Sequence, residues 1–200
     1  MFKKAIIYIP GLNDQSFLNK TFNNLFKILW KRFGYEIYII QPHWQEESVF
    51  SSKLKLITDK IDELSNNDYE VYLIGQSAGG SAALNAFTER KSKVKKVINV
   101  CGRIKKGDNI SPTLEQASRN SPAFKESVLL FENQNQQKLT KEDREKILTM
   151  RSLWDEVVPL TTIPLEGATN ITIPMVEHSL TGFSALTIFS SRIREFLLPA

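Results

Sequence analysis

Ser77 is the residue of this chain whose surroundings most strongly indicate chemistry. It stands between Gly75 and Gly79 in the segment GQSAG. Mostly apolar residues, 71–74, precede this segment as a predicted buried strand, and an Ala-rich helical run begins near residue 80. A serine between two glycines at a strand-to-helix junction is the nucleophile-elbow pattern, in which a strained turn presents the hydroxyl above a sheet. We therefore expect side chains in place of Gly75 and Gly79 to collide with neighbouring backbone.

A serine hydroxyl is a weak nucleophile at neutral pH and needs a base to take its proton. The chain contains only two histidines, His43 and His178. His178 lies between the last predicted strand and the last predicted helix, so it can reach over the ends of the strands. His43 also follows a strand and is not excluded by its location. We favour His178 as the base.

A carboxylate beside the base would hold its tautomer and stabilise the imidazolium ion. Asp155 lies just after a predicted strand, in the segment SLWDEVVP, and precedes His178 with room for one further strand and its loops. Its neighbour Glu156 is the main competitor for this role. Three weaker competitors are Asp143, Glu166 and Glu177. Asp155 is the predicted acid.

The order Ser77, Asp155, His178 is the one that accompanies a G-x-S-x-G elbow. On these three sites, the chain resembles a small α/β-hydrolase over essentially its whole length. The resemblance implies a mostly parallel sheet with helices on both faces and a serine hydrolase of the esterase, lipase or thioesterase type. It also implies an acyl-Ser77 intermediate, a small-molecule acyl ester or thioester as substrate, and neither a metal nor an organic cofactor.

The same resemblance implies an oxyanion hole of two backbone N–H groups. One belongs to the residue after the nucleophile, which is Ala78 here. The other comes from the loop after the first strand, where Leu12 is the candidate and Asn13 the alternative. The chain has Pro10-Gly11 at the place where the lipase-like pattern has His-Gly. Gln76 directly precedes the nucleophile, and we assign it no catalytic role.

The elements that must position these residues alternate along the chain. Apolar runs predict strands at 5–9, 35–40, 71–74, 94–100, 147–151 and 171–174. Helical periodicity predicts helices over 18–33, over 54–64 with Ser51 or Ser52 as N-cap, from about 80 to 90, and over 185–197 with Ile188 on its buried face. This alternation favours parallel strands joined by right-handed crossovers, with functional groups at the carboxyl ends of the strands.

Residues 102–145 interrupt the alternation with a polar segment that contains no predicted strand. Within it, Phe124, Val128 and Phe131 share one helical face, whereas residues 133–138 are too polar for the core. A segment of this kind favours a small cap or lid over a second domain. We therefore predict a single domain over residues 1–200. From the placement of the loops, we expect five apolar residues near the site entrance: Leu12, Trp44, Phe124, Trp154 and Leu180.

Composition narrows the classes of function. The chain has 200 residues, a net charge of +4 and one cysteine, Cys101. One cysteine excludes an internal disulfide framework and a cysteine-based zinc site, and we expect Cys101 to be buried and structural. The lysines are spread along the chain, so nucleic-acid binding is not expected. No apolar stretch is long enough for a membrane span, and the N-terminal apolar run is too short for a signal peptide, so we expect a cytoplasmic protein.

Two other functions remain open at the level of sequence. An acyltransferase or amidase would use the same three residues and differ only in the acceptor that reaches the acyl-enzyme. A non-catalytic binding protein could retain the fold, because a fold does not determine a function. The oligomeric state is likewise open.

Overall fold

The computed structural model describes residues 3–12, 17–46, 49–108 and 110–198, except for the side chains of residues 17–20 and 22. Six strands form one sheet in the order β2-β1-β3-β4-β5-β6, and every neighbouring pair is parallel. Their bounds are β1 (Lys3–Ile9), β2 (Tyr35–Ile39), β3 (Tyr69–Gln76), β4 (Val94–Val100), β5 (Ile147–Arg151) and β6 (Thr169–Thr172). The parallel sheet confirms the prediction from the alternation of elements.

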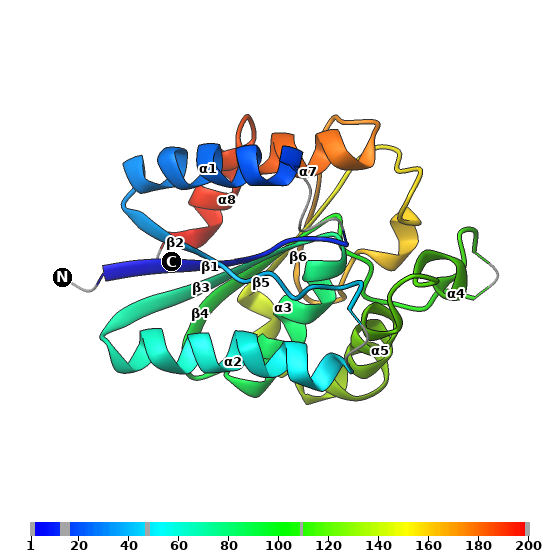
Figure 1. Cartoon of the computed structure of the whole chain (residues 1–200), viewed down its shortest axis with the longest axis horizontal. Coiled ribbons are helices and arrows are strands. Elements are labelled where there is room, and N and C mark those ends of the chain that lie inside the picture. Colours follow the sequence, from blue (N-terminus) through cyan, green and yellow to red (C-terminus); the bar gives the residue numbers. More distant parts are fainter. Residues whose placement is uncertain (1–2, 13–16, 47–48, 109, 199–200) are drawn as a thin grey trace.

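Helices cover both faces of the sheet (Figure 1). On one face lie α1 (Phe17–Arg32), α7 (His178–Leu186) and α8 (Ser190–Leu197); on the other lie α2 (Phe50–Asn66), α3 (Ala78–Glu89) and α5 (Pro122–Leu130). The remaining helical segments are α4 (Leu114–Ala117), the π-helix η1 (Phe131–Asn135), the 3₁₀-helices η2 (Gln136–Lys138) and η3 (Leu160–Thr162), and α6 (Lys141–Glu145).

The two helix layers create two hydrophobic cores because successive strand residues point to opposite faces. In β1, Ile7 and Ile9 belong to the core beneath α2, α3 and α5, whereas Ile6 and Tyr8 belong to the core beneath α1, α7 and α8. All four are at most 2% exposed. This burial on both faces explains why the central strands are continuous apolar runs in the sequence.

Two predictions about helix ends are wrong. Helix α2 begins at Phe50, and its N-cap is Val49, which makes no side-chain cap bond; Ser51 and Ser52 lie inside the first turn. The predicted closing helix is two helices, α7 and α8, interrupted at residues 187–189. Ile188 lies in this interruption and is 70% exposed, so its predicted burial is wrong.

The segment 102–145 is divided between two environments. Phe124, Val128 and Phe131 are buried in the core, which confirms their common apolar face, and α5 packs against α2 and α3. The helix layer thus continues through this segment, whereas α4 lies at the far edge of the molecule (Figure 1). That residues 102–145 act as a lid remains a prediction.

One polar residue of this segment contradicts the prediction that residues 133–138 avoid the core. Asn135 is 2% exposed, and its amide nitrogen donates to Asn85 Oδ1 at 2.8 Å. Asn85 in turn donates to the carbonyl oxygen of Ser127 at 2.8 Å. A buried amide is tolerated where its polar atoms have partners, and a partner on α3 cannot be read from local polarity.

Candidate active site

Ser77 occupies the tight turn between β3 and α3. Its φ of 53° and ψ of −122° place it in a backbone region that residues with a Cβ rarely adopt. Hydrogen bonds hold the turn on both sides: the Ser77 amide donates to Val100 O at 2.9 Å, and Ser77 O accepts from the Gly80 amide at 2.9 Å. The strained elbow predicted from the sequence is confirmed.

The glycines on either side of Ser77 are required by close backbone packing. A Cβ on Gly75 would lie 2.2 Å from Gly79 O, and a Cβ on Gly79 would lie 2.0 Å from Ile9 O. Real Cβ atoms do not come so close to backbone oxygens. The absence of side chains therefore allows the first turn of α3 to pack against the ends of β3 and β1, which confirms the predicted collision.

The structure brings three of the predicted site residues into one chain of hydrogen bonds. Ser77 Oγ lies 2.9 Å from His178 Nε2, and His178 Nδ1 lies 2.8 Å from Asp155 Oδ2. The residues come from three places: the elbow after β3, the loop after β5, and the first residue of α7. His178 therefore begins a helix, whereas the sequence predicted a loop. The Asp155 side chain is fully buried, and the His178 side chain is 11% exposed.

The other candidate base and acid have different surroundings. His43 Nδ1 lies 3.6 Å from Glu46 Oε1 on the surface. The Glu156 carboxylate accepts a hydrogen bond from the backbone amide of His178 at 3.1 Å, so it holds the end of α7 and not the ring. Glu177 is the N-cap of α7 and accepts from the backbone amides of Ser179 and Leu180. Asp155, and not Glu156, contacts the imidazole.

The pKa of Asp155 reflects two opposing effects. Burial of the carboxyl acts to raise its pKa, but hydrogen bonds from His178 and from the amides of Val158 and Val157 outweigh burial, so the pKa lies below its ordinary value. The two amides donate to Oδ1 at 2.7 and 2.9 Å, which leaves Oδ2 for His178. Asp155 is therefore an ionised acceptor at neutral pH.

The lowered pKa of Asp155 predicts how stability changes in acid. The unfolded-state pKa is about 3.9, so this carboxylate stabilises the fold fully above a pH of about 4, and the contribution is lost as pH falls through the lower folded pKa. We expect Asp155→Asn to lose less of its free energy of unfolding than the wild type between a pH of about 5 and about 2.5. Urea unfolding across this range measures both slopes, and equal slopes would contradict the prediction.

The loop after β1 passes directly beside Ser77. A Cβ on Gly11 would lie 2.8 Å from Ser77 Cβ, so this glycine permits the approach. Leu12 follows it in a turn and is half-buried, and Ala78 is the first residue of α3. Asn13 lies outside the described residues. The loop's course fits the predicted pair of amide donors, Leu12 and Ala78, whose roles remain predictions.

Two residues that hold the neighbouring loops were not identified from the sequence. Trp44, expected near the site entrance, is fully buried and donates from Nε1 to Pro10 O at 3.0 Å, which fixes the loop before Leu12. Asn99 is fully buried, accepts from the Gly102 amide at 3.0 Å and donates to Gly102 O at 2.9 Å. The sequence does contain a signal for Asn99: it lies near the end of the apolar strand β4, and asparagine is depleted in strands.

Exposed apolar side chains gather in the loop after β5, which carries Asp155, and in the loop after β6 together with the helix α7, which begins at His178. The two loops lie side by side, since the Leu153 amide donates to Met175 O at 2.9 Å. These segments supply half of the exposed large hydrophobic side chains among the described residues. We call this set the apolar rim: Leu153, Trp154, Val157, Val176, Leu180 and Phe183. By contrast, Phe124, another residue expected at the entrance, is buried in the core.

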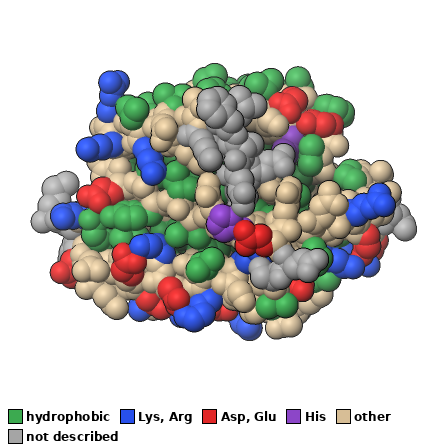
Figure 2. All heavy atoms as spheres, in the orientation of Figure 1, with side chains coloured by type: hydrophobic (Ala, Val, Ile, Leu, Met, Phe, Trp, Pro, Cys, Tyr) green, Lys and Arg blue, Asp and Glu red, His purple; other side chains and the backbone are tan. Residues whose placement is uncertain are grey.

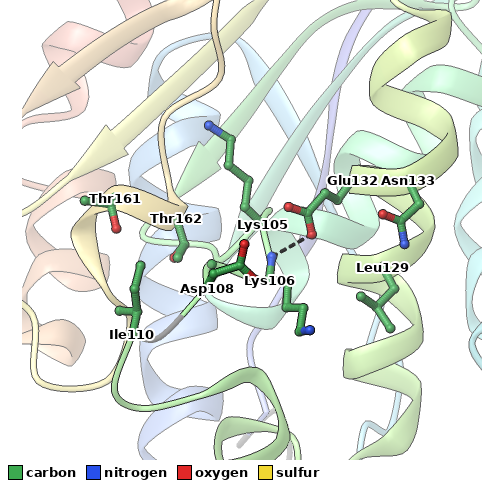
Figure 3. Close-up of a pocket in the computed structure, with 10 residues that line it drawn as sticks. Lys105, Lys106, Asp108, Ile110, Leu129, Glu132, Asn133, Thr161 and Thr162 are labelled. Carbon is green, nitrogen blue, oxygen red and sulfur yellow. Dashed lines mark hydrogen bonds between the residues drawn. The ribbon is translucent and has the colours of Figure 1, made fainter.

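A cavity of about 510 Å³ lies between the loop after β4, the end of α5 and η3 (Figure 3). Its lining is mixed in charge, with Lys105, Lys106, Asp108 and Glu132 among the residues that form it. The Glu132 carboxylate accepts from the Lys106 amide at 2.7 Å, which ties the loop to η1, directly after α5. None of Ser77, Asp155 and His178 lines this cavity.

Other classes of site are weakly represented in the structure. The part of the chain that is described contains no group of three or more His, Cys, Asp or Glu side chains placed to hold a metal. No helix among the described residues is long and apolar enough to cross a membrane. On the face shown in Figure 2, lysines and arginines are scattered among acidic residues and form no continuous basic patch. Cys101 is buried, as expected.

The parallel sheet, its two helix layers and the strained serine turn after β3 define the α/β-hydrolase fold. No protein-family model and no curated protein matches the sequence. Solved structures match almost the whole chain at low identity, and three of them illustrate the likeness.

A structure of the metagenome-derived lipolytic enzymes LipS and LipT is 13% identical over 98% of this chain and 94% of its own, with a TM-score of 0.66. Est1E from Butyrivibrio proteoclasticus is 14% identical over 97% of this chain and 86% of its own, with a TM-score of 0.67. The monoacylglycerol lipase of Paleococcus ferrophilus is 15% identical over 96% and 93%, with a TM-score of 0.60. At these identities the likeness establishes the fold.

Proposed function

We propose that this protein is a serine hydrolase that cleaves a carboxylic ester or thioester through an acyl-Ser77 intermediate. The observation that carries the proposal is the continuous chain of hydrogen bonds from Ser77 Oγ through His178 to the buried Asp155. The names of the structural neighbours, which include lipolytic enzymes, an esterase and a lipase, support an ester as the substrate class.

The direction of proton transfer follows from the ionised state of Asp155. A carboxylate can only accept hydrogen bonds, so the neutral His178 ring carries its proton on Nδ1 and offers the lone pair of Nε2 to the Ser77 hydroxyl. When Ser77 Oγ bonds to the acyl carbon, its proton passes to Nε2. The resulting imidazolium then gives that proton to the leaving alcohol or thiol as the acyl–oxygen or acyl–sulfur bond breaks.

The second half of the reaction repeats these roles with water. His178 removes a proton from water as its oxygen attacks the acyl-Ser77 carbonyl, and then returns a proton to Ser77 Oγ as the ester bond breaks. The Leu12 and Ala78 amides are proposed to donate to the carbonyl oxygen, which becomes negatively charged in each step. A preorganised donor of this kind typically contributes about 100- to 1000-fold in rate.

The apolar rim favours substrates with an apolar group. Large side chains such as Trp154 and Leu180 are 56% and 53% exposed beside the proposed base and acid, where an acyl chain or an aromatic leaving group can cover them. We expect turnover of p-nitrophenyl esters, with kcat/KM rising by up to about fourfold for each methylene that the apolar rim buries, because each buried methylene contributes about 0.8 kcal/mol.

A chain-length series of p-nitrophenyl esters, run beside the corresponding acyl thioesters, tests this proposal. Trp154→Ala provides the matched variant, because it should flatten the dependence on chain length and leave the rate with acetate nearly unchanged. Absence of turnover with every ester and thioester would contradict the proposed function. A flat series in the wild type would contradict only the role of the apolar rim.

A further inference from the structure

Helix α7 meets the end of β3 at two adjacent points. Ser77 contacts His178 at the first point, and Gln76 contacts Gly182 at the second. His178 and Gly182 are four residues apart, so they lie one turn apart on the same face of the helix. Consecutive residues of one strand end therefore contact consecutive turns of the helix that carries the proposed base.

The contact between Gln76 and Gly182 is close enough to set the distance between the two elements. A Cβ on Gly182 would lie 2.1 Å from Gln76 Nε2 and 2.7 Å from Gln76 Cδ. The side-chain amide of Gln76 thus occupies the space that any larger residue would need at position 182. The helix approaches as far as this amide allows.

The side-chain amide of Gln76 is held in place by Tyr8, which lies on the neighbouring strand β1. The Tyr8 hydroxyl donates a hydrogen bond to Gln76 Oε1, and Tyr8 is only 2% exposed. Its ring packs against Phe26, with ring centroids 5.0 Å apart, in the core beneath α1, α7 and α8. The amide is therefore a fixed spacer, because moving it would break its hydrogen bond to a tyrosine that is packed in the core.

Helix α7 is also held at its two ends. The Glu156 carboxylate binds the backbone amide of His178, and Trp30 Nε1 donates to Leu186 O at 2.9 Å. Because both ends of α7 are held, a spacer against its middle sets the distance between the helix and the sheet. A shift of about 1 Å in a reacting group can lower a rate by about 100-fold.

We propose that Gln76 is a positioning residue that sets the approach of α7 to the elbow and thereby the separation of His178 Nε2 from Ser77 Oγ. This inference rests on the proposed function, since it assigns a role relative to the proposed nucleophile and base. Gln76 acts through Gly182 and the helix, and it does not take part in proton transfer.

A double-mutant experiment separates this role from general packing. Gly182→Ala adds the colliding methyl group and is expected to lower the rate constant of acylation about 10- to 100-fold with little change in KM. Gln76→Ala removes the spacer and should cost less, because no collision results. The double variant Gln76→Ala/Gly182→Ala should regain at least about tenfold over Gly182→Ala alone, since the methyl group enters the vacated space.

The measurements are the pre-steady-state burst with a p-nitrophenyl ester and the rate of inactivation by a fluorophosphonate probe. Alanine is the better helix former, so a role of Gly182 in helix stability alone predicts no loss of rate in Gly182→Ala. A wild-type rate in Gly182→Ala, or a double variant as slow as the product of the two single effects, would overturn the proposal.

An activity-independent readout distinguishes failure of this inference from failure of the proposed function. The chain has only two histidines, so protein labelled with ¹⁵N-histidine gives ring signals from His43 and His178 alone. We expect the His178 ring signals to move in Gly182→Ala and to return toward their wild-type positions in the double variant, while the His43 signals stay fixed. Unmoved His178 signals would overturn the positioning role, whereas an inert wild type with moving signals would overturn only the proposed reaction.

Discussion

Replacing Ser77 by alanine is expected to lower kcat/KM for an aryl ester by a factor on the order of 10⁴ to 10⁶. The hydroxyl is the only group at this position that can form the acyl bond, and alanine leaves the residual rate from binding and oxyanion donors. The melting temperature should change little, because alanine retains the Cβ and the backbone bonds of the elbow. Initial rates and thermal unfolding of the same preparations measure both effects.

Ser179→Ala is the matched control for this loss. Ser179 is exposed beside His178. Alanine keeps the bond from its backbone amide to Glu177 and removes only the hydroxyl's hydrogen bond to the same carboxylate. We expect this variant to retain nearly the wild-type rate. A Ser77→Ala enzyme with more than about a tenth of wild-type activity would contradict the assignment of the nucleophile.

Asp155→Asn is expected to lower kcat by about 10⁴-fold with the fold intact. An asparagine at this position can turn its NH₂ group toward His178 Nδ1, which then must be the acceptor, so the ring proton moves to Nε2. In that tautomer, Nε2 cannot accept the proton of Ser77. Asparagine also removes the negative charge that stabilises the imidazolium ion.

The neighbouring variant Glu156→Gln tests whether position 155 is the correct one. The glutamine oxygen can still accept from the backbone amide of His178, so we expect a loss of only a few-fold. Steady-state kinetics of the two variants give the comparison directly. A larger loss in Glu156→Gln than in Asp155→Asn would move the proposed acid by one residue.

Local sequence signals were sufficient for most of the sheet and for the central residues of the site. The strands at 94–100 and 147–151 have the predicted bounds, because their apolar runs are buried on both faces and end in polar segments. Ser77 was identifiable because a strained turn requires neighbouring glycines. His178 was identifiable because only two histidines exist and only one follows the last strand.

The remaining features depend on tertiary contacts that no local pattern encodes. The break between α7 and α8 falls at residues 187–189, where neither glycine nor proline marks it, and there the Phe189 amide turns back to Ser184 O at 2.8 Å. Asn135 is buried because Asn85, on another helix, supplies its partner. No sequence pattern singles out Gln76, because its contact with Gly182 forms only when α7 packs against β3.

Labelling by a fluorophosphonate probe, followed by intact-mass analysis and peptide mapping, tests the central proposal most directly. The probe reacts with a serine hydroxyl that a neighbouring base activates, and it requires no knowledge of the natural substrate. We predict one adduct per chain, located on the peptide that contains Ser77 and absent from Ser77→Ala. An unlabelled wild type, or an adduct on any other residue, would contradict the assignment of Ser77 as the nucleophile.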